Sequence, residues 1–161
     1  MAHPLEEEAA KQTAAPRVLL VDDQPELRRL FRRSLGKAGF EVVEAWDGRV
    51  AIELLRKSPF DVVISDVRMP DMSGMELLKA LHELDPDLPV VLTSGSPDTS
   101  STSEANEFGA FAYLVKPVPF DLMRDTAERA VLLRRARKEA RESFEPYASV
   151  ERLRVPRPPE R

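Results

Sequence analysis

The chain has 161 residues, of which 42% are hydrophobic and 32% charged, so it is about the size of one globular domain. The net charge of −4 argues against bulk electrostatic binding to nucleic acid, and the absence of cysteine excludes disulfides and thiolate sites. No apolar run approaches the ~20 residues that span a bilayer, and the acidic first residues lack the apolar core of a secretory signal. A cytoplasmic protein is therefore expected.

Short apolar runs alternate with amphipathic stretches along the chain. Residues 1–15 are charged and lack a periodic apolar face, which predicts a disordered leader. Apolar runs predict strands at 18–21, 40–45, 60–66, 88–94 and 111–115. Helical spacing predicts helices at 26–39, 47–58 and 73–84, with Asp47 and Ser73 as N-caps and Gly36 or Gly39 ending the first helix. The predicted fold class is α/β, a doubly wound five-stranded parallel sheet with helices on both faces.

Two segments depart from this pattern. The stretch between Ser94 and Gly109 is rich in serine and threonine, which predicts a short, loosely held fourth helix with Ala105 and Phe108 as its core contacts. After Pro119 a helix of some 24 residues is predicted to end near Pro146 and to be followed by an extended tail. The basic run at 134–141 is interpreted first as the solvated face of this helix. A coiled-coil stalk and a contact with an acidic partner remain alternatives.

Polar side chains gather where four of the predicted strands end. They are Asp22 and Asp23, Asp66, Thr93 and Ser94, and Lys116. The reactive crevice of a doubly wound sheet lies at the carboxyl ends of its strands, so these groups are expected at one pocket, with the second strand at the sheet edge. Clustered carboxylates without histidine or cysteine favour Mg²⁺ or Mn²⁺, with Asp66 as an attacking carboxylate and Lys116 balancing the charge of a phosphoryl group.

The same residues lie in four motifs, VDD (21–23), DVRMPDMSG (66–74), TSG (93–95) and GAFAYLVKP (109–117). Together, and at this spacing, they make the chain resemble the CheY-like receiver domains of response regulators in two-component signalling. The resemblance covers about residues 16–132 and leaves 133–161 as an extended basic helix and a Pro-rich tail. It implies the strand order 2-1-3-4-5 and a signalling phosphoacceptor that catalyses only its own phosphorylation and dephosphorylation.

The resemblance also implies a role for each site residue. Asp66 is the expected phosphoacceptor and a ligand of the metal. Asp23 is expected to bind the metal directly and Asp22 through water, while Arg68 contributes its backbone carbonyl. Lys116 is expected to contact the phosphoryl oxygens, and the peptide bond between it and the following proline is expected to be cis.

A hydroxyl and an aromatic ring complete the expected switch. Ser94 lies 22 residues before Lys116, the spacing typical of the family's switch hydroxyl, and Thr93 is the fallback. Tyr113, three residues before Lys116, matches the aromatic residue that moves inward when the hydroxyl is drawn to the phosphoryl group.

The expected partners are a sensor histidine kinase or phosphotransfer protein, and a downstream protein that binds the surface of the fourth helix, fifth strand and fifth helix. A phosphorylation-dependent dimer is a further expectation, and neither membrane nor direct nucleic-acid binding is expected. A stand-alone regulator is preferred, with a fragment of a hybrid histidine kinase or multidomain regulator as the alternative.

Two other classes of protein share parts of the pattern. A haloacid-dehalogenase-like phosphatase also uses an aspartate nucleophile with Mg²⁺, but it needs a second aspartate where this chain has Arg68. A flavodoxin-like FMN binder needs a hydroxyl- and glycine-rich loop after the first strand, where DDQPE would instead repel a phosphate.

Overall fold

The computed structural model describes residues 14–148, with side chains as far as residue 143. Most of the predicted leader and the Pro-rich tail lie outside the described residues. The sheet consists of β1 (Arg17–Val21), β2 (Glu41–Ala45), β3 (Val62–Asp66), β4 (Val90–Ser94) and β5 (Ala112–Val115). All neighbouring strands are parallel and the order is β2-β1-β3-β4-β5, so the predicted fold class and the edge position of the second strand are confirmed.

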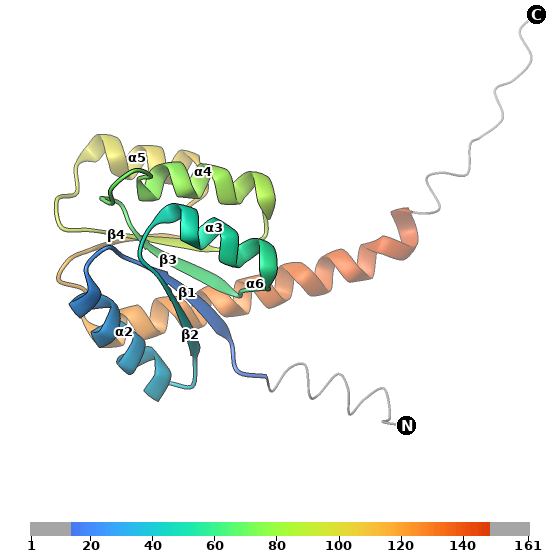
Figure 1. Ribbon diagram of the computed structural model, residues 1–161. Helices are drawn as coiled ribbons and strands as arrows, with labels where there is room; N and C mark the ends of the chain where they lie inside the picture. The colour runs from blue at the N-terminus through green and yellow to red at the C-terminus, as the bar shows by residue number, and fades with distance from the viewer. Residues whose placement is uncertain (1–13, 149–161) are drawn as a thin grey trace, which may run out of the picture.

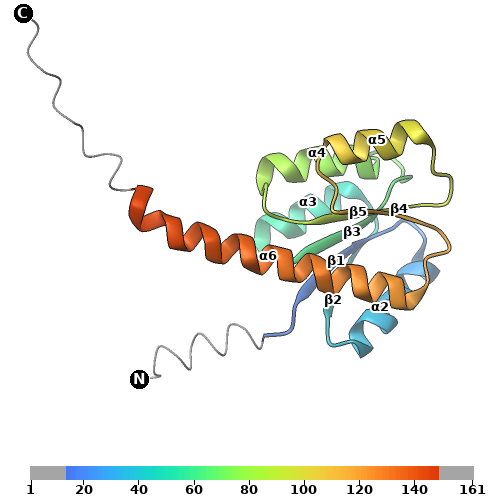
Figure 2. The same cartoon turned by 180° about the vertical axis from the view of Figure 1, so that it is seen from behind.

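Helices cover both faces of the sheet, as Figures 1 and 2 show. They are α2 (Pro25–Lys37), α3 (Gly48–Lys57), α4 (Gly74–Leu84), α5 (Thr99–Glu107) and α6 (Phe120–Ala148). α3, α4 and α5 pack on one face, where Leu19, Val63 and Leu92 lie fully buried. α2 and α6 pack on the other, over Val18 and Val91. Because consecutive strand residues point to opposite faces, each central strand supplies both cores.

The helix termini follow the predicted signals. The Asp47 Oδ1 atom accepts a hydrogen bond from the Val50 amide, 2.8 Å away, and the Ser73 hydroxyl accepts one from the Glu76 amide at 3.1 Å, so both predicted N-caps are confirmed. α2 ends at Lys37, and Gly39 adopts a φ of +95° in the turn to β2, a conformation that favours glycine. Among the described helices, none is both long and apolar enough to cross a membrane.

The fourth of the five described helices, α5, is short, as predicted. It has nine residues, and Ala105 is its buried side chain. A capping box between Asp98 and Ser101 holds its first turn. The prediction of Phe108 as a core contact is wrong, because the residue is 37% exposed. The ammonium of Lys79 lies over its ring, 4.4 Å from the ring centroid.

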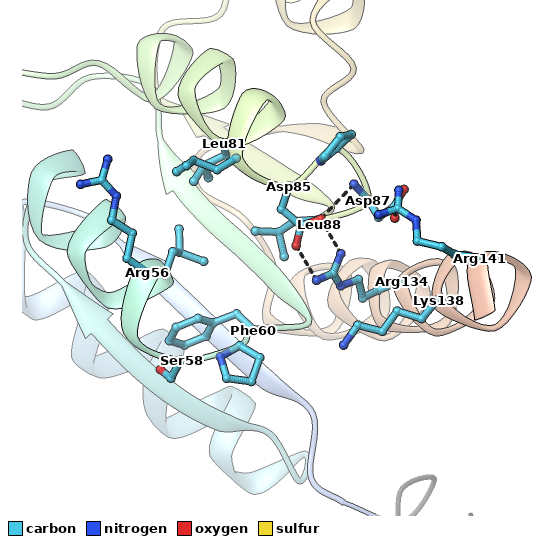
Figure 3. A pocket seen from close by; sticks show the side chains of 14 residues that line it. Arg56, Ser58, Phe60, Leu81, Asp85, Asp87, Leu88, Arg134, Lys138 and Arg141 are labelled. Atoms are coloured by element: carbon cyan, nitrogen blue, oxygen red, sulfur yellow. Dashed lines mark hydrogen bonds and ion pairs between the residues drawn. The ribbon is translucent and has the colours of Figure 1, made fainter. Parts of the chain in front are cut away.

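The last helix, α6, runs back from the site edge along the sheet and continues past the opposite edge (Figure 1). It ends at Ala148, two residues beyond the predicted end at Pro146. Interpreting the basic run as a solvated face is wrong for Arg134, which is 7% exposed. Its guanidinium makes two hydrogen bonds to the Asp85 carboxylate in the turn between α4 and β4, one of 2.8 Å and one of 2.5 Å (Figure 3). Arg141 pairs with Asp87 at 2.6 Å in the same turn.

The pair of Arg134 and Asp85 provides a test of how the helix extension is held. Asp85→Asn should lower the free energy of unfolding by about 2 kcal/mol, less than a fully buried pair would give, because the Asp85 side chain is 35% exposed. Arg134→Met should cost less, since the carboxylate it leaves behind reaches water. Urea unfolding followed by circular dichroism measures both. The control is Arg141→Met, which breaks a pair whose arginine is 62% exposed and is expected within about 0.5 kcal/mol of the parent.

The effect of Asp85→Asn should depend on pH. Burial alone would raise the pKa of the Asp85 carboxyl, but the hydrogen bonds and charge of Arg134 outweigh it and hold the pKa below the ordinary 3.8. The stabilisation is therefore complete above pH 3.8 and is lost as the pH falls through the lower folded-state pKa. A stability difference between parent and variant that grew on acidification would contradict this assignment.

Candidate functional site

The site lies at the carboxyl edge of the sheet, where backbone hydrogen bonds continue the strands into its functional residues. Asp22 follows β1, and its amide donates to the Ala45 carbonyl of β2 at 3.2 Å. Asp66 is the last residue of β3 and pairs with Thr93 of β4. The Lys116 amide, just after β5, donates to the Ser94 carbonyl at 2.8 Å. The sheet itself thus fixes the spacing between these side chains.

Three carboxylates come together at this edge. Asp22, Asp23 and Asp66 each offer an oxygen, and the three oxygens lie within 4.8 Å of one another. Asp22 and Asp66 are 5% and 6% exposed, whereas Asp23 faces solvent. The structure therefore brings together the three aspartates that the sequence places at strand ends, with one of them open to water.

Lys116 reaches into this acidic cluster. Its Nζ atom lies 2.8 Å from Asp66 Oδ2 and 3.3 Å from Asp22 Oδ2. Burial would lower the pKa of the ammonium, but the hydrogen bond to Asp66 and the charges of both aspartates outweigh it, so the pKa of Lys116 lies above its ordinary value. The lysine is therefore a fixed cation within the acidic cluster. The peptide bond to Pro117 is cis, as the resemblance implied.

Burial raises the pKa of the Asp22 carboxyl above its ordinary value, and the charge of Asp66 adds to the rise. The Gln24 amide, which donates to Asp22 Oδ1 at 2.8 Å, and Lys116 act in the opposite direction without cancelling it. A buried carboxylate that is costly to ionise is stabilised by a nearby cation. The donor set is purely carboxylate oxygen, which fits Mg²⁺ or Mn²⁺ and does not fit a metal that requires nitrogen or sulfur.

Hydrogen bonds from Ser65 and Arg68, on either side of Asp66 in the sequence, hold this residue at the end of β3. The Arg68 amide donates to Asp66 Oδ1 at 3.2 Å, and the Ser65 hydroxyl donates to the Asp66 carbonyl at 3.0 Å. Gly74, the first residue of α4, donates its amide to the Val67 carbonyl at 2.9 Å. A Cβ atom at Gly74 would overlap the Asp66 carbonyl oxygen. The loop can close this tightly only because residue 74 has no side chain.

Ser94 and Thr93 occupy opposite faces of β4. Val90 and Leu92 belong to the core under α3, α4 and α5, so by alternation Ser94 lies on that face and Thr93 on the face of α2 and α6. Tyr113 packs against the same core as Leu92. Ser94 is 1% exposed, and its hydroxyl accepts a hydrogen bond from the Ser96 amide at 3.2 Å. Of the two candidate hydroxyls, Ser94 is thus the one that shares a face with Tyr113.

The Tyr113 hydroxyl contacts the first turn of α5. It lies 3.2 Å from the Ser101 hydroxyl oxygen. The Ser101 hydroxyl donates to the Asp98 carbonyl at 3.2 Å. The Ser101 amide in turn donates to Asp98 Oδ1 at 2.6 Å. The tyrosine is therefore tied to the same residues that cap α5, so movement of the ring and the order of this helix turn are physically linked.

Sequence reasoning missed two residues that support the site. One is Gly74, whose importance comes from a backbone approach between residues eight positions apart. The other is Arg28 of α2, which donates to the Asp22 carbonyl at 2.6 Å while its Nε lies 3.6 Å from Glu44. Helical spacing could show only that Arg28 follows the apolar Leu27, and nothing local distinguishes it from its arginine neighbours.

The profile of the family described as "Response regulator receiver domain" matches residues 18–128. This chain belongs to that family. A receiver domain of this kind is a signalling phosphoacceptor, and the acidic cluster of Asp22, Asp23 and Asp66 is the characteristic pocket of the domain.

Relatives of the receiver domain come from several kinds of organism. The chain is 43% identical over 122 residues to the C4-dicarboxylate transport transcriptional regulatory protein DctD of Pseudomonas aeruginosa, which covers 76% of the chain and 26% of DctD. It is 42% identical over 111 residues to the two-component response regulator ORR26 of Oryza sativa subsp. japonica. This alignment covers 68% of the chain and 19% of ORR26. The chain thus spans about a quarter or less of the length of these relatives.

Solved structures show the same fold. The chemotaxis protein CheY4 of Vibrio cholerae is similar with a TM-score of 0.69 and 35% identity, over 73% of this chain and 99% of CheY4. A receiver domain protein from Clostridium thermocellum gives a TM-score of 0.71 and 28% identity, over 78% of this chain and 98% of that one. The receiver fold therefore accounts for about three quarters of the chain.

Proposed function

We propose that this receiver domain accepts a phosphoryl group on Asp66 from the phosphohistidine of a sensor kinase or phosphotransfer protein. The observation that supports this most directly is the position of the Asp66 carboxylate, which is nearly buried, held by the Arg68 amide and 2.8 Å from the Lys116 ammonium. A carboxylate fixed beside a cation is suited to attack a phosphorus atom whose oxygens that cation then binds.

In the proposed reaction an Asp66 oxygen forms a bond to phosphorus as the phosphorus–nitrogen bond of phosphohistidine breaks, and the electron pair leaves with the imidazole. Lys116 moves from its carboxylate partners to the oxygens of the transferred group. Asp23 and Asp66, with Asp22 through water and the Arg68 carbonyl, would hold Mg²⁺, which supplies neutralisation of the charge that develops on the phosphoryl oxygens. Asp22 and Lys116 are the groups whose pKa values the site already perturbs.

Incubation of the chain with Mg²⁺ and a small-molecule phosphodonor tests the proposal. The expected result is incorporation of one phosphoryl group that is labile to hydroxylamine, because an acyl phosphate, unlike a phosphoserine, reacts with that nucleophile. No incorporation in the presence of Mg²⁺, or incorporation resistant to hydroxylamine, would contradict an aspartyl phosphate.

The second part of the proposed function is a switch of the surface formed by α5, β5 and α6. Phosphorylation adds about −2 of charge, by analogy with phosphorylated hydroxyls, next to Lys116 and Ser94. Movement of Ser94 toward this charge would open space on its own face of the sheet, where Tyr113 packs. Because Tyr113 also contacts the α5 cap, the change would reach a helix with a single buried residue.

Ser94→Ala tests the switch without removing the phosphoacceptor. Beryllofluoride, which mimics the phosphoryl group on aspartate, should change amide hydrogen exchange across 99–107 in the parent chain, and this change should be largely lost in Ser94→Ala. A coupling of ~1–3 kcal/mol, typical of allosteric sites, corresponds to a ~5–150-fold change in the opening equilibrium. Thr93→Ala is the matched control because it removes a hydroxyl from the opposite face. A loss in Thr93→Ala alone would move the switch to Thr93.

The domain boundaries belong to the same proposal. We infer a receiver domain over residues 16–132 and an extension over 133–161, in a protein that acts through protein partners rather than nucleic acid or membrane. A stand-alone regulator and a part of a multidomain regulator are both compatible with this layout, since the relatives it matches are several times longer. A phosphatase remains disfavoured, because Arg68 replaces the second aspartate that hydrolysis would need.

A further inference from the structure

A cavity of about 530 Å³, here called the basal cavity, lies at the amino ends of β3 and β4. It is on the opposite edge of the sheet from the acidic cluster, between the ends of α3 and α4 and the extension of α6 (Figure 3). Its apolar wall includes Leu55, Phe60, Leu81, Leu84 and Leu88. Leu84 is 50% exposed, so part of this wall faces water and could be covered by an apolar side chain.

The charged residues of the basal cavity leave an excess of positive charge. Four basic residues line it, Arg56, Arg134, Lys138 and Arg141, against two acidic ones, Asp85 and Asp87. Arg134 and Arg141 pair with these aspartates. Within the described part of the chain, Arg56 and Lys138 form no ion pair, and both are exposed. The cavity is therefore suited to a segment that carries several carboxylates beside one apolar side chain.

The start of the described chain lies next to this cavity. A second cavity of about 630 Å³ is lined by Ala14 and Ala15 and shares Pro59, Phe60 and Lys138 with the basal cavity. The Ala14 carbonyl accepts a hydrogen bond from the guanidinium of Arg135 at 3.1 Å, which ties this point to α6. The basic residues of the second cavity, Arg17, Arg135 and Lys138, are matched in number by the acidic Asp61, Glu139 and Glu142. An acidic segment is thus favoured electrostatically in the basal cavity rather than in the second one.

The residues just before Ala14 have the composition that the basal cavity requires. The sequence HPLEEEAAKQT places Leu5 directly before Glu6, Glu7 and Glu8. Ala14 is the sixth residue after Glu8. Six extended residues reach about 20 Å, which is enough to pass from the second cavity into the adjoining basal cavity.

We propose that the N-terminal segment Leu5–Glu8 binds the basal cavity of its own chain. Leu5 contacts the apolar wall at Leu84, and the glutamates interact with Arg56 and Lys138. The proposal does not depend on phosphorylation of Asp66, because the cavity lies at the other edge of the sheet.

The absence of cysteine makes a direct test straightforward, because Ala9→Cys gives a single thiol for a nitroxide spin label in the full chain. The label should broaden the amide resonances of Leu84, Asp85, Asp87 and Leu88, on the wall of the basal cavity. A triple variant in this background, Glu6→Gln with Glu7→Gln and Glu8→Gln, should raise those intensities about twofold or more. A salt concentration of ~1 M should do the same, because it screens the attraction between exposed charges. Broadening near Ala14 comes from the tether and should not change.

Variants of the cavity complete the test. Arg56→Gln with Lys138→Gln should restore the same intensities, whereas Arg49→Gln, which removes one charge from the other end of α3, should not. Equal broadening in the parent and glutamine variants would overturn the proposal. A mixed sample separates the two possible sources of the segment. It combines spin-labelled chain at natural isotopic abundance with ¹⁵N-enriched chain that carries no spin label. Broadening in that mixture would show binding to a second copy and would overturn binding within one chain.

Discussion

Asp66→Ala is expected to abolish phosphorylation of the chain. The variant removes the only carboxylate that is at once nearly buried, held by the Arg68 amide and within 2.8 Å of Lys116 among the described residues. Asp22 and Asp23 remain, but neither has this combination of contacts. The measurement is hydroxylamine-labile incorporation from a small-molecule phosphodonor in the presence of Mg²⁺, with loss to background as the expected result.

The matched control is Asp125→Asn, a change on α6 at a carboxylate whose side chain is 54% exposed. It should incorporate phosphoryl groups as the parent does. Circular dichroism of Asp66→Ala should match that of the parent, since removing one of several crowded carboxylates relieves repulsion. Full incorporation in a folded Asp66→Ala would remove Asp66 from the role of phosphoacceptor.

Gly74→Ala is expected to damage both the fold and the site. Its Cβ would overlap the Asp66 carbonyl oxygen and press on the Val67 Cα atom, and both are backbone groups that cannot turn away as a side chain could. Overpacking of this kind costs about 3 kcal/mol in unfolding free energy. Any relaxation must move either the start of α4 or Asp66 itself, so the initial rate of phosphorylation should fall as well.

Gly36→Ala supplies the control for this substitution. Gly36 lies near the end of α2, where an added Cβ meets nothing within 4 Å. Because alanine has a higher helix propensity than glycine, the unfolding free energy of this variant should rise by up to about 1 kcal/mol. It should be phosphorylated at the parent rate. Urea unfolding at fixed pH measures both variants. Unchanged stability in Gly74→Ala would show that the loop between β3 and α4 yields more easily than its contacts indicate.

Much of this architecture could be predicted from sequence because its determinants are local. Runs such as VVI (62–64) and VVL (90–92) are apolar on both faces, which identifies central parallel strands. Asp47 and Ser73 are caps that act within one helical turn. The positions of Asp22, Asp66 and Lys116 also follow, since the ends of parallel strands meet at one edge. Sequence periodicity and strand direction together were sufficient for these features.

The features that sequence did not predict depend on contacts between distant segments. Arg134 looked like one of several solvated arginines, yet its partner Asp85 is 49 residues away. Phe108 is a large apolar residue, which favours burial in the core, but its position at the end of α5 leaves it partly exposed beneath Lys79. In each case the local pattern was ambiguous, and only the packing of a neighbouring element decided which surface was covered.

The length of α6 has a mechanical consequence. At 1.5 Å per residue its 29 residues extend about 43 Å, and the part beyond Arg134 measures about 21 Å. Arg134 and Arg141 pair with aspartates in the turn before β4, so these ion pairs fix the direction of the helix extension relative to the core. A tilt of about 10° where the helix meets the sheet would swing the tip by about 4 Å. Any tilt of α6 against the sheet would thereby be magnified at the distant end of the molecule.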